Sequence, residues 1–296
     1  MRIKTSAMAA YSMRKMSTED DWFNYSIGHT IGKKLKPLFK KTTPTVSSYL
    51  IFASAESFSI ATYNAAKNWD GTLEYSTDAK NWTEWNGTTI YSANNHIYMR
   101  GKGNNRITGD NENYRWVLTG TDIKCFGNIE NLLNYEIVAK DEHPVMAEYC
   151  YGCMFEGCTS LTTAPDLPAT TLADRCYYYM FYGCTSLTEV PSLSATTLTE
   201  RCYYHMFDKC TSLTTLPELP ATILTERCYY YMFANCTSIK LSADLTDEYT
   251  ISYRIPSSGT GMTATDALTN MLASTGGTFT GTPTINTIYY TSNEVV

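Results

Sequence analysis

Cysteine and histidine are the side chains of this sequence whose chemistry has to be tested first. The chain has ten cysteines and four histidines. Cys150 and Cys153 form a Cys-x-x-Cys pair, a spacing that is typical of zinc and redox sites. A zinc ion would need further ligands at a compatible spacing, and His143, the nearest histidine, has no partner histidine. We therefore predict no metal site and no cofactor.

The sequence contains no short motif of a known catalytic centre. The patterns G-x-S-x-G and H-E-x-x-H do not occur, and Gly101 and Gly103 lack the strand–loop–helix context of a phosphate-binding loop. A glycosidase needs only two carboxylates, so a carbohydrate-active enzyme is kept as the third-ranked interpretation. We predict that the protein has no catalytic residue and is not an enzyme.

Eight of the cysteines fall into two columns with a constant spacing of 26 residues. Met-Phe pairs and a following leucine or isoleucine share this spacing, so the chain carries four copies of one unit. One unit cannot bury its own apolar face, which means that the copies must stack. Because free cysteine packs like a small apolar residue, we predict two structural thiol columns rather than disulfides. They are Cys150, Cys176, Cys202 and Cys228, and Cys158, Cys184, Cys210 and Cys236.

Each unit needs elements that turn its apolar residues inward. Cys176, Met180 and Cys184 recur at intervals of four, which predicts about two turns of helix with this face buried. The segment Thr185–Thr188 predicts a short strand with Leu187 inward. We expect equivalent strands to pair in parallel along the stack, about 4.8 Å apart.

The repeated unit also carries a family resemblance. Its pattern, C-Y-Y-x-M-F-x-x-C-T-S-L-T followed by P-x-L-P-A-T-x-L, resembles the BspA-type leucine-rich repeat family. It is similar to repeats in surface and virion proteins of gut bacteria and their tailed phages. The resemblance covers residues 145–245 and extends loosely to residues 126–133, which we expect to cap the first repeat. Residues 267–275 resemble a degraded unit inside a C-terminal cap.

Residues 45–122 have a different pattern, in which short apolar segments alternate with turn signals. Six segments predict strands, at 49–52, 58–61, 72–75, 89–91, 97–100 and 114–118. Six strands at this spacing predict a small, Ig-like β-sandwich, and the stretch resembles the β-domain that precedes such repeats. Ser76, Asp78 and Trp82 partly resemble an Asp-box hairpin, a structural motif, although Lys80 stands at its glycine position.

The fold class that follows is mixed and β-rich, with a leucine-rich-repeat solenoid of 26-residue units and a C-terminal cap. We predict four parts along the chain. They are a basic N-terminal anchoring arm (1–44), the β-sandwich (45–122), the solenoid (123–245) and a capping segment (246–296).

Two groups of aromatic residues are candidates for a binding surface. Consecutive tyrosines on a helix cannot all face inward, so part of each repeat's tyrosine run is expected at the surface. A ladder of Tyr178, Tyr204 and Tyr230 could stack on sugar rings or contact a partner protein, and Trp82 and Trp85 could form a second platform. Structural packing along the flank of the stack, and over the hairpin, is the competing interpretation.

The net charge of −6 hides a strong asymmetry. Residues 1–44 have a net charge of +6, whereas the rest of the chain has −12. This split predicts an arm that docks on an acidic partner, with a solvated basic tail as the alternative. The proposed anchoring residues are Arg2, Lys4, Arg14, Lys15, Lys33, Lys34, Lys36, Lys40 and Lys41. The overall acidity argues against nucleic acid as a partner, and no run of about 18 apolar residues could span a membrane.

The start of the chain lacks the apolar run of a secretory signal. With the resemblance, this implies a non-enzymatic structural protein of a phage virion, assembled in the host cytoplasm. It would be a capsid decoration or head fibre, or a tail-associated module. Its expected partners are other virion proteins and a host-surface protein or glycan, and an oligomer is compatible with the sequence. The alternative is a bacterial surface adhesin with leucine-rich repeats that binds host protein or glycan at the cell surface.

Overall fold

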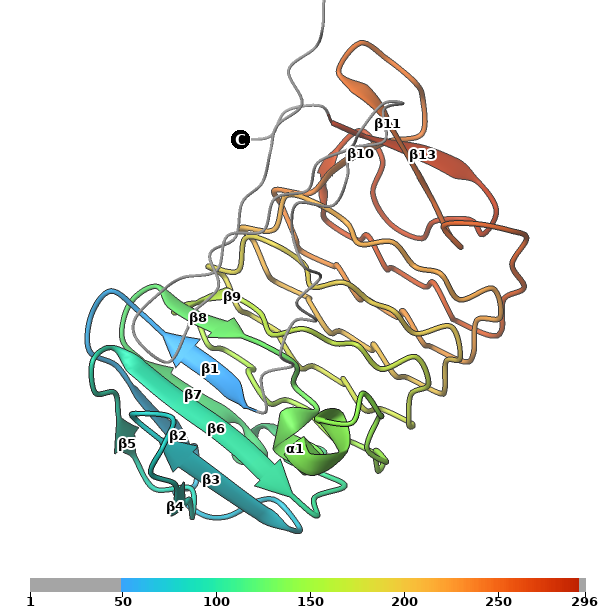
Figure 1. Cartoon of the computed structure of the whole chain (residues 1–296). Helices are drawn as coiled ribbons and strands as arrows, with labels where there is room; N and C mark the ends of the chain where they lie inside the picture. Colours follow the sequence, from blue (N-terminus) through green and yellow to red (C-terminus); the bar gives the residue numbers. More distant parts are fainter. Residues whose placement is uncertain (1–48, 293–296) are drawn as a thin grey trace, which may run out of the picture. The chain divides into compact units, whose positions relative to one another are not determined.

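The computed structural model describes residues 49–292, which belong to one compact unit, Val46–Val296 (Figure 1). These residues form a β-rich fold with one α-helix, one 3-10 helix and thirteen strands in three sheets. The elements are β1 (Leu50–Ala53), β2 (Ser59–Thr62), β3 (Thr72–Ser76), β4 (Thr83–Glu84), β5 (Ile90–Tyr91), β6 (His96–Lys102), η1 (Glu112–Tyr114), β7 (Trp116–Thr119), β8 (Ile123–Phe126), α1 (Asn131–Val138), β9 (Leu161–Thr163), β10 (Lys240–Ser242), β11 (Tyr249–Arg254), β12 (Gly276–Gly277) and β13 (Ile288–Ser292). Neither helix in this range has the length and apolar character that a membrane span requires.

Two sheets form the first part of the described chain. A six-stranded sheet has the order β4-β3-β6-β1-β8-β9, and a three-stranded sheet has the order β5-β2-β7. Burial alternates along β6, where Ile97 and Met99 have no exposed surface, as expected for a strand with one buried face. The two sheets share a core, because the Phe52 ring of β1 lies 6.2 Å from the Trp116 ring of β7.

All six strands predicted in this region are present, with ends shifted by at most two residues. The sequence did not indicate β4, which is two exposed residues long, or β8. Strand β8 pairs antiparallel with β1 and parallel with β9, the first strand of the repeats. One buried core therefore continues from the sheets into the repeats, while the predicted domain boundaries stay predictions.

The loop between β3 and β4 is organised by the carboxylate of Asp78. Its Oδ1 accepts hydrogen bonds from the backbone N–H groups of Asn81 and Lys80, at 2.8 and 2.9 Å, and from Ser76 Oγ at 2.9 Å. These bonds, that from the Asn81 N–H first, hold the pKa of Asp78 well below its usual value. The carboxylate therefore acts here as the structural centre of a hairpin turn.

The predicted helix in each repeat is wrong. Residues 149–158 and their equivalents form runs of tight turns in which every fourth residue has a positive φ. In the second copy these residues are Arg175, Tyr179 and Gly183, with φ of 54°, 53° and 70°. An α-helix cannot contain such left-handed residues. The turns nevertheless bury Met180 and Cys184 four residues apart, which is the spacing that predicted the helix.

Backbone hydrogen bonds alternate between the turn and the next copy, and this alternation explains why the turns stack. In the first copy, even-numbered residues such as Met154 donate to the carbonyl three residues earlier. Odd-numbered residues donate across to the second copy, as Tyr151 does to Cys176 O and Phe155 to Met180 O, both at 2.8 Å. Half of the N–H groups thus find their acceptors only on a neighbouring coil.

The same ladder continues to residues 267–275, drawn in orange to red in Figure 1. The N–H of Tyr229 donates to Ala267 O and that of Phe233 to Met271 O, both at 2.9 Å. This segment is therefore a fifth coil, which confirms that residues 267–275 are a degraded unit. Strands β10 to β13 lie around it in the chain and form a four-stranded sheet with the order β11-β13-β10-β12.

The strand predicted at Thr185–Thr188 is not formed. Among the equivalent segments only the first and the last are strands, β9 and β10. Leu187 is buried as predicted, and its N–H donates back to Cys184 O, as the N–H of Leu161 does to Cys158 O in the first copy. Isolated parallel bridges, between Leu167 and Leu193 and between Thr171 and Thr197, join the first two copies.

Residues 126–133 cover the first coil at its N-terminal side. Ile129, Leu132 and Leu133 have no exposed surface, and the Ile129 carbonyl accepts a hydrogen bond of 3.4 Å from the Tyr151 hydroxyl. Helix α1 begins within this segment, at Asn131, and is kinked at Asn134, whose φ of −159° and ψ of 95° are not helical. Strand β7 completes the contact, since the Trp116 N–H donates to Met154 O at 2.7 Å.

The core of the repeats consists of columns of identical side chains. Tyr151, Tyr177, Tyr203 and Tyr229 stack with ring centroids 5.6–5.7 Å apart. All ten cysteines are free and buried, so both thiol columns lie inside. The second column has a bonding role: the thiols of Cys184, Cys210 and Cys236 each donate to a phenylalanine carbonyl of the preceding coil at 3.0 Å.

Candidate functional site

Two columns of half-buried rings run along the repeats, and we call these six residues the aromatic face. In the first column, ring centroids are 5.1 and 4.9 Å apart and the planes lie within 12°. In the second, they are 4.7 and 4.8 Å apart and the planes lie within 8°. The first column is Tyr178, Tyr204 and Tyr230, and the second is Tyr179, His205 and Tyr231.

The turn geometry decides which rings reach this face. Tyr177 and its equivalents precede the first column and point into the core. The second column occupies the left-handed position of the turn, with φ of 53° at Tyr179 and 52° at His205. In the first coil the same position is held by Cys153, which is 3% exposed. Two of three consecutive ring positions therefore leave the core in the second, third and fourth coils.

The ring stacking determines what the aromatic face can bind. Both faces of the Tyr204 ring are covered, by Tyr178 on one side and Tyr230 on the other, in near-parallel stacks. Sugar rings therefore cannot stack on the middle of the column, which corrects that part of the prediction. A ligand can contact only the edges and the hydroxyl groups of these rings, which repeat at the spacing of the coils. Such an array suits an extended partner surface.

Polar contacts between neighbouring coils hold the second column in place. His205 Nδ1 lies 2.7 Å from Asp208 Oδ2, and Asp208 is only 4% exposed. Asn235 of the next coil donates to Asp208 Oδ1 at 2.8 Å. The Tyr231 hydroxyl accepts a hydrogen bond of 2.6 Å from Asn270 Nδ2 on the fifth coil. The rings are thus fixed by their neighbours before any ligand arrives.

A ladder of ion pairs runs along the same coils. Arg175 joins Glu148 and Glu200, at 2.5 and 3.0 Å. Arg227 lies 3.3 Å from Asp266 on the fifth coil. These groups are partly exposed, so each pair contributes about 0–1 kcal/mol. The ladder neutralises its own charges and does not present an anion site.

Burial keeps hydroxyl groups of the aromatic face protonated. It raises the pKa of Tyr178 to about 12 and also raises the pKa of Tyr204, since a phenolate would lose solvation. Both hydroxyls therefore remain hydrogen-bond donors at neutral pH.

The two tryptophans proposed as a second platform do not lie on one surface. Trp85 is 1% exposed, stacks on Trp69 at 5.0 Å and donates from Nε1 to Thr88 O. Its predicted place on a binding surface is wrong, because it belongs to the core between the two sheets. Trp82 is half-buried, and the Arg100 guanidinium lies 4.0 Å from its ring centroid.

The Cys-x-x-Cys pair has no metal-binding surroundings. Within residues 49–292, no group of three or more His, Cys, Asp or Glu side chains could hold a metal ion. Burial raises the pKa of the Cys150 and Cys153 thiols, which disfavours the thiolate that ligates metals. This arrangement supports a packing role for both residues.

Sequence reasoning missed the second aromatic column. The binding surface predicted from the sequence does not include Tyr179, His205 or Tyr231. The available signal was a planar side chain at the same position of three successive units. The nine basic residues proposed for anchoring, from Arg2 to Lys41, lie outside the described residues, so the anchoring hypothesis stays a prediction.

Comparison with known proteins adds no relative from which a function could be transferred. No family model, no curated protein and no solved structure matches this chain.

Proposed function

We propose that this chain is a non-enzymatic structural protein of a tailed-phage virion that docks through its basic N-terminal arm and displays a repeat-based binding surface. The observation that carries the display role is the aromatic face, in which six rings repeat at the coil spacing. A pre-ordered surface of this kind binds without a large ordering cost. Its repetition fits a protein or polymer that contacts several coils at once.

We further infer that the stacked coils are a leucine-rich-repeat solenoid and that the two N-terminal sheets are an Ig-like β-sandwich. The inference about the coils is supported by their 26-residue period, their buried leucines and their coil-to-coil hydrogen bonds. The sandwich is supported by the aromatic contacts between the two sheets.

The absence of an enzymatic role is part of the proposal. Stacked copies place chemically equivalent groups at every level, whereas a catalytic centre needs one unique constellation. The thiols, which would be the most nucleophilic side chains, are all buried within the described residues.

Docking through the arm is supported by charge. The arm has a net charge of +6 and the rest of the chain has a net charge of −12, so the arm attracts acidic surfaces and the rest of the chain attracts basic ones. An acidic site on an assembling particle would select the arm and repel the body. The position of this acidic surface on the particle would decide whether the chain docks on the capsid or on the tail.

The docking proposal is tested by incorporation into particles. One variant lacks residues 1–44, and a second, full-length variant replaces the nine basic residues with glutamine. Both should be missing from purified virions, because each removes the positive charge that the acidic site would attract. A matched control, Tyr63→Phe, should be incorporated like the wild type. Normal incorporation of the deletion variant would refute the anchoring role.

The display proposal is tested by adsorption of particles to host cells. The triple change Tyr178→Phe, Tyr204→Phe and Tyr230→Phe keeps the stacked rings and removes their hydroxyls. At about 1 kcal/mol for each lost hydrogen bond, adsorption should weaken at least about tenfold. Tyr63→Phe removes an exposed hydroxyl elsewhere and serves as the control. Equal adsorption of all particles would exclude the first aromatic column as the binding surface.

A bacterial surface adhesin is the second candidate, favoured by the resemblance of the repeats to those of bacterial surface proteins. It predicts that the native chain is exported and accessible on intact cells. Detection of the chain on the cell surface, and its absence from purified virions, would replace the virion proposal with this one.

A further inference from the structure

The four-stranded sheet of the last part of the described chain ends on one side in an open edge strand. Strand β11 stands first in the order β11-β13-β10-β12, and β13 is the one strand that pairs with it among residues 49–292 (Figure 1). The backbone N–H and C=O groups on the other side of β11 therefore have no strand partner in this range. Such an edge is a template for pairing with another chain.

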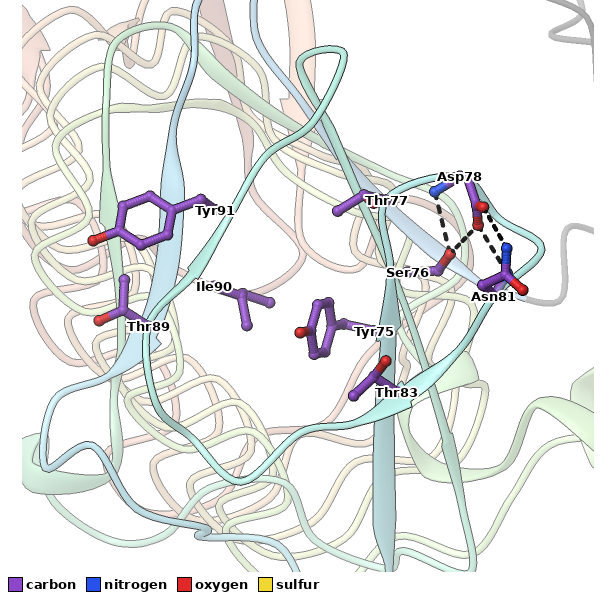
Figure 2. A pocket seen from close by; sticks show the side chains of 9 residues that line it. All are labelled: Tyr75, Ser76, Thr77, Asp78, Asn81, Thr83, Thr89, Ile90 and Tyr91. Carbon is purple, nitrogen blue, oxygen red and sulfur yellow. Dashed lines mark hydrogen bonds between the residues drawn. The ribbon is translucent and has the colours of Figure 1, made fainter.

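Among the edge strands of the three described sheets, β11 is the longest. It has six residues, whereas β4, β5 and β12 have two and β9 has three. Strand β4 also belongs to a hairpin held by Asp78, whose hydrogen bonds with Ser76 and Asn81 are drawn in Figure 2. Strand β7 has four residues, and its Trp116 N–H already donates to Met154 O. Strand β11 contains neither proline nor lysine, the residues that commonly protect an edge.

The middle of β11 exposes an apolar side chain. Ile251 is 55% exposed, and its neighbours Thr250 and Ser252 are exposed as well. By strand alternation Ile251 lies on the same face as Tyr253, which packs against the core. The register with β13 shifts between Tyr249 and Ile251, so the regular part of the edge begins at Ile251. A β-branched apolar residue exposed on an unpaired edge points to another strand as its partner.

The charges at the two ends of β11 are opposite. Glu248 precedes the strand, is exposed and has no hydrogen-bond or ion-pair partner among the described residues. Arg254 ends the strand, and its guanidinium donates to Pro256 O at 3.3 Å and to Asn286 Oδ1 at 3.2 Å. Within residues 49–292 it forms no ion pair, so further N–H groups remain for a carboxylate.

We propose that two copies of this chain pair antiparallel through β11 and form a dimer whose sheet runs through both copies. In such a pair the two-fold axis passes a residue that faces its own equivalent. Centred on Ile251, the pairing covers the two isoleucines with each other. It also places Arg254 of each copy opposite the acidic pair Asp247 and Glu248 of the other copy.

This register is favoured over its neighbours by the charges. Opposite charges and β-branched side chains that face each other stabilise antiparallel strands. A register shifted by two residues in either direction would move Arg254 away from Asp247 and Glu248. Strand β11 contributes no residue to the aromatic face, so the dimer goes beyond the proposed function and does not depend on it.

The dimer is tested by sedimentation velocity of the full-length chain from about 1 to 200 µM, which suits an interface below about 1,200 Å². The mean sedimentation coefficient should rise from that of a monomer to that of a dimer. Ile251→Lys should raise the Kd of the dimer at least about tenfold, because two lysines would face each other at the axis. Ile223→Lys changes an isoleucine of similar exposure, 59%, on a coil, and should dimerise like the wild type.

Thermal unfolding curves of both lysine variants should match that of the wild type, since both side chains are exposed, and this excludes a folding defect. A wild-type chain that stays monomeric over the whole range would refute the proposal. Equal Kd values for the wild type and Ile251→Lys would refute it as well.

The register is tested by crosslinking. In Ile251→Cys the new thiols of two copies face each other, whereas all ten native cysteines are buried. Mild oxidation should therefore produce a disulfide-linked dimer on a non-reducing gel. Ile223→Cys is the matched control and should stay monomeric. Equal crosslinking of the two variants, or of neither, would contradict antiparallel pairing centred on Ile251.

Discussion

His205 shows how one side chain can depart from a repeat and still fit it. The ring stacks between Tyr179 and Tyr231, at 4.7 and 4.8 Å, as a tyrosine would. Its Nδ1 also faces the buried Asp208 of the same coil, where the other copies have glutamate, tyrosine or alanine. The histidine and the aspartate therefore occur as a pair.

The pair predicts an effect of His205→Phe on stability. The phenylalanine ring keeps the stack but leaves Asp208 Oδ2 without its partner, which should lower the free energy of unfolding by about 1–3 kcal/mol. Denaturation with urea measures the change. Asp208→Asn and the double variant complete a cycle, in which the two changes should cost less together than their sum. Additive effects would show that the contact is not coupled.

Glu130 is a second residue whose surroundings predict a measurable effect. Its side chain is 1% exposed, and Oε2 lies 2.8 Å from His143 Nδ1. Burial raises the pKa of Glu130, while His143 opposes this shift. The folded chain thus holds the Glu130 proton more tightly than the unfolded chain, whose glutamate pKa is about 4.3. By linkage, the contribution of Glu130 to stability falls as pH rises from about 4 through the raised value.

The test compares the pH dependence of unfolding in the wild type and in Glu130→Gln. Glutamine does not ionise, so this variant should lose less stability than the wild type between about pH 4 and pH 8. Glu84→Gln, on the exposed strand β4, is the control and should keep the wild-type dependence. Parallel curves for wild type and Glu130→Gln would contradict the prediction.

At the scale of the element, the stacked coils depend on a residue with a left-handed backbone conformation at every fourth position of the turns. Gly183 has a φ of +70°, and a Cβ added there would have no neighbour closer than 3.9 Å. Gly183→Val should therefore cost backbone strain without a steric clash, about 1–2 kcal/mol in unfolding free energy. Gly183→Asn is the matched control and should cost clearly less, because asparagine tolerates this conformation. Equal losses would mean that φ does not limit the choice of residue.

The elements also show what could be predicted from the sequence and what could not. The six strands of residues 45–122 were predictable because apolar segments and turn residues alternate there. The repeat period and the inward residues were equally evident. The turn run was mistaken for a helix because Cys176, Met180 and Cys184 fit a period of four as well as one of 3.6. The glycines at 157 and 183, and Asn235 at the same position, were the available sign of left-handed residues.

The candidate site was predicted only in part, for a geometric reason. The first aromatic column was predictable from its spacing of 26 residues. Its exposure and ring stacking depend on the left-handed turns of each coil, where the sequence pattern indicated a helix. Trp85 was misplaced because an aromatic residue near a hairpin gives no sign of which side of the sheet it occupies.

At the scale of the whole molecule, one core runs through sheets and coils, so coils should be removable only as complete units. Deletion of residues 177–202 joins Cys176 to Tyr203 and preserves every column. This variant should unfold cooperatively, at a lower temperature than the wild type, because one coil interface is lost. Deletion of residues 177–189 shifts the register and should abolish the cooperative transition. Circular dichroism and calorimetry distinguish the outcomes, and equal behaviour of the two deletions would refute the prediction.

The alternating hydrogen bonds have a consequence for the gene. Each coil offers to the preceding one the same row of carbonyl acceptors that it finds on the following one, so the ladder of hydrogen bonds does not fix the number of copies. Recombination between the similar coding segments of two repeats can therefore lengthen or shorten the protein by whole coils in frame. Such events would change how far apart the two ends of the stack are held, without requiring any new folding information.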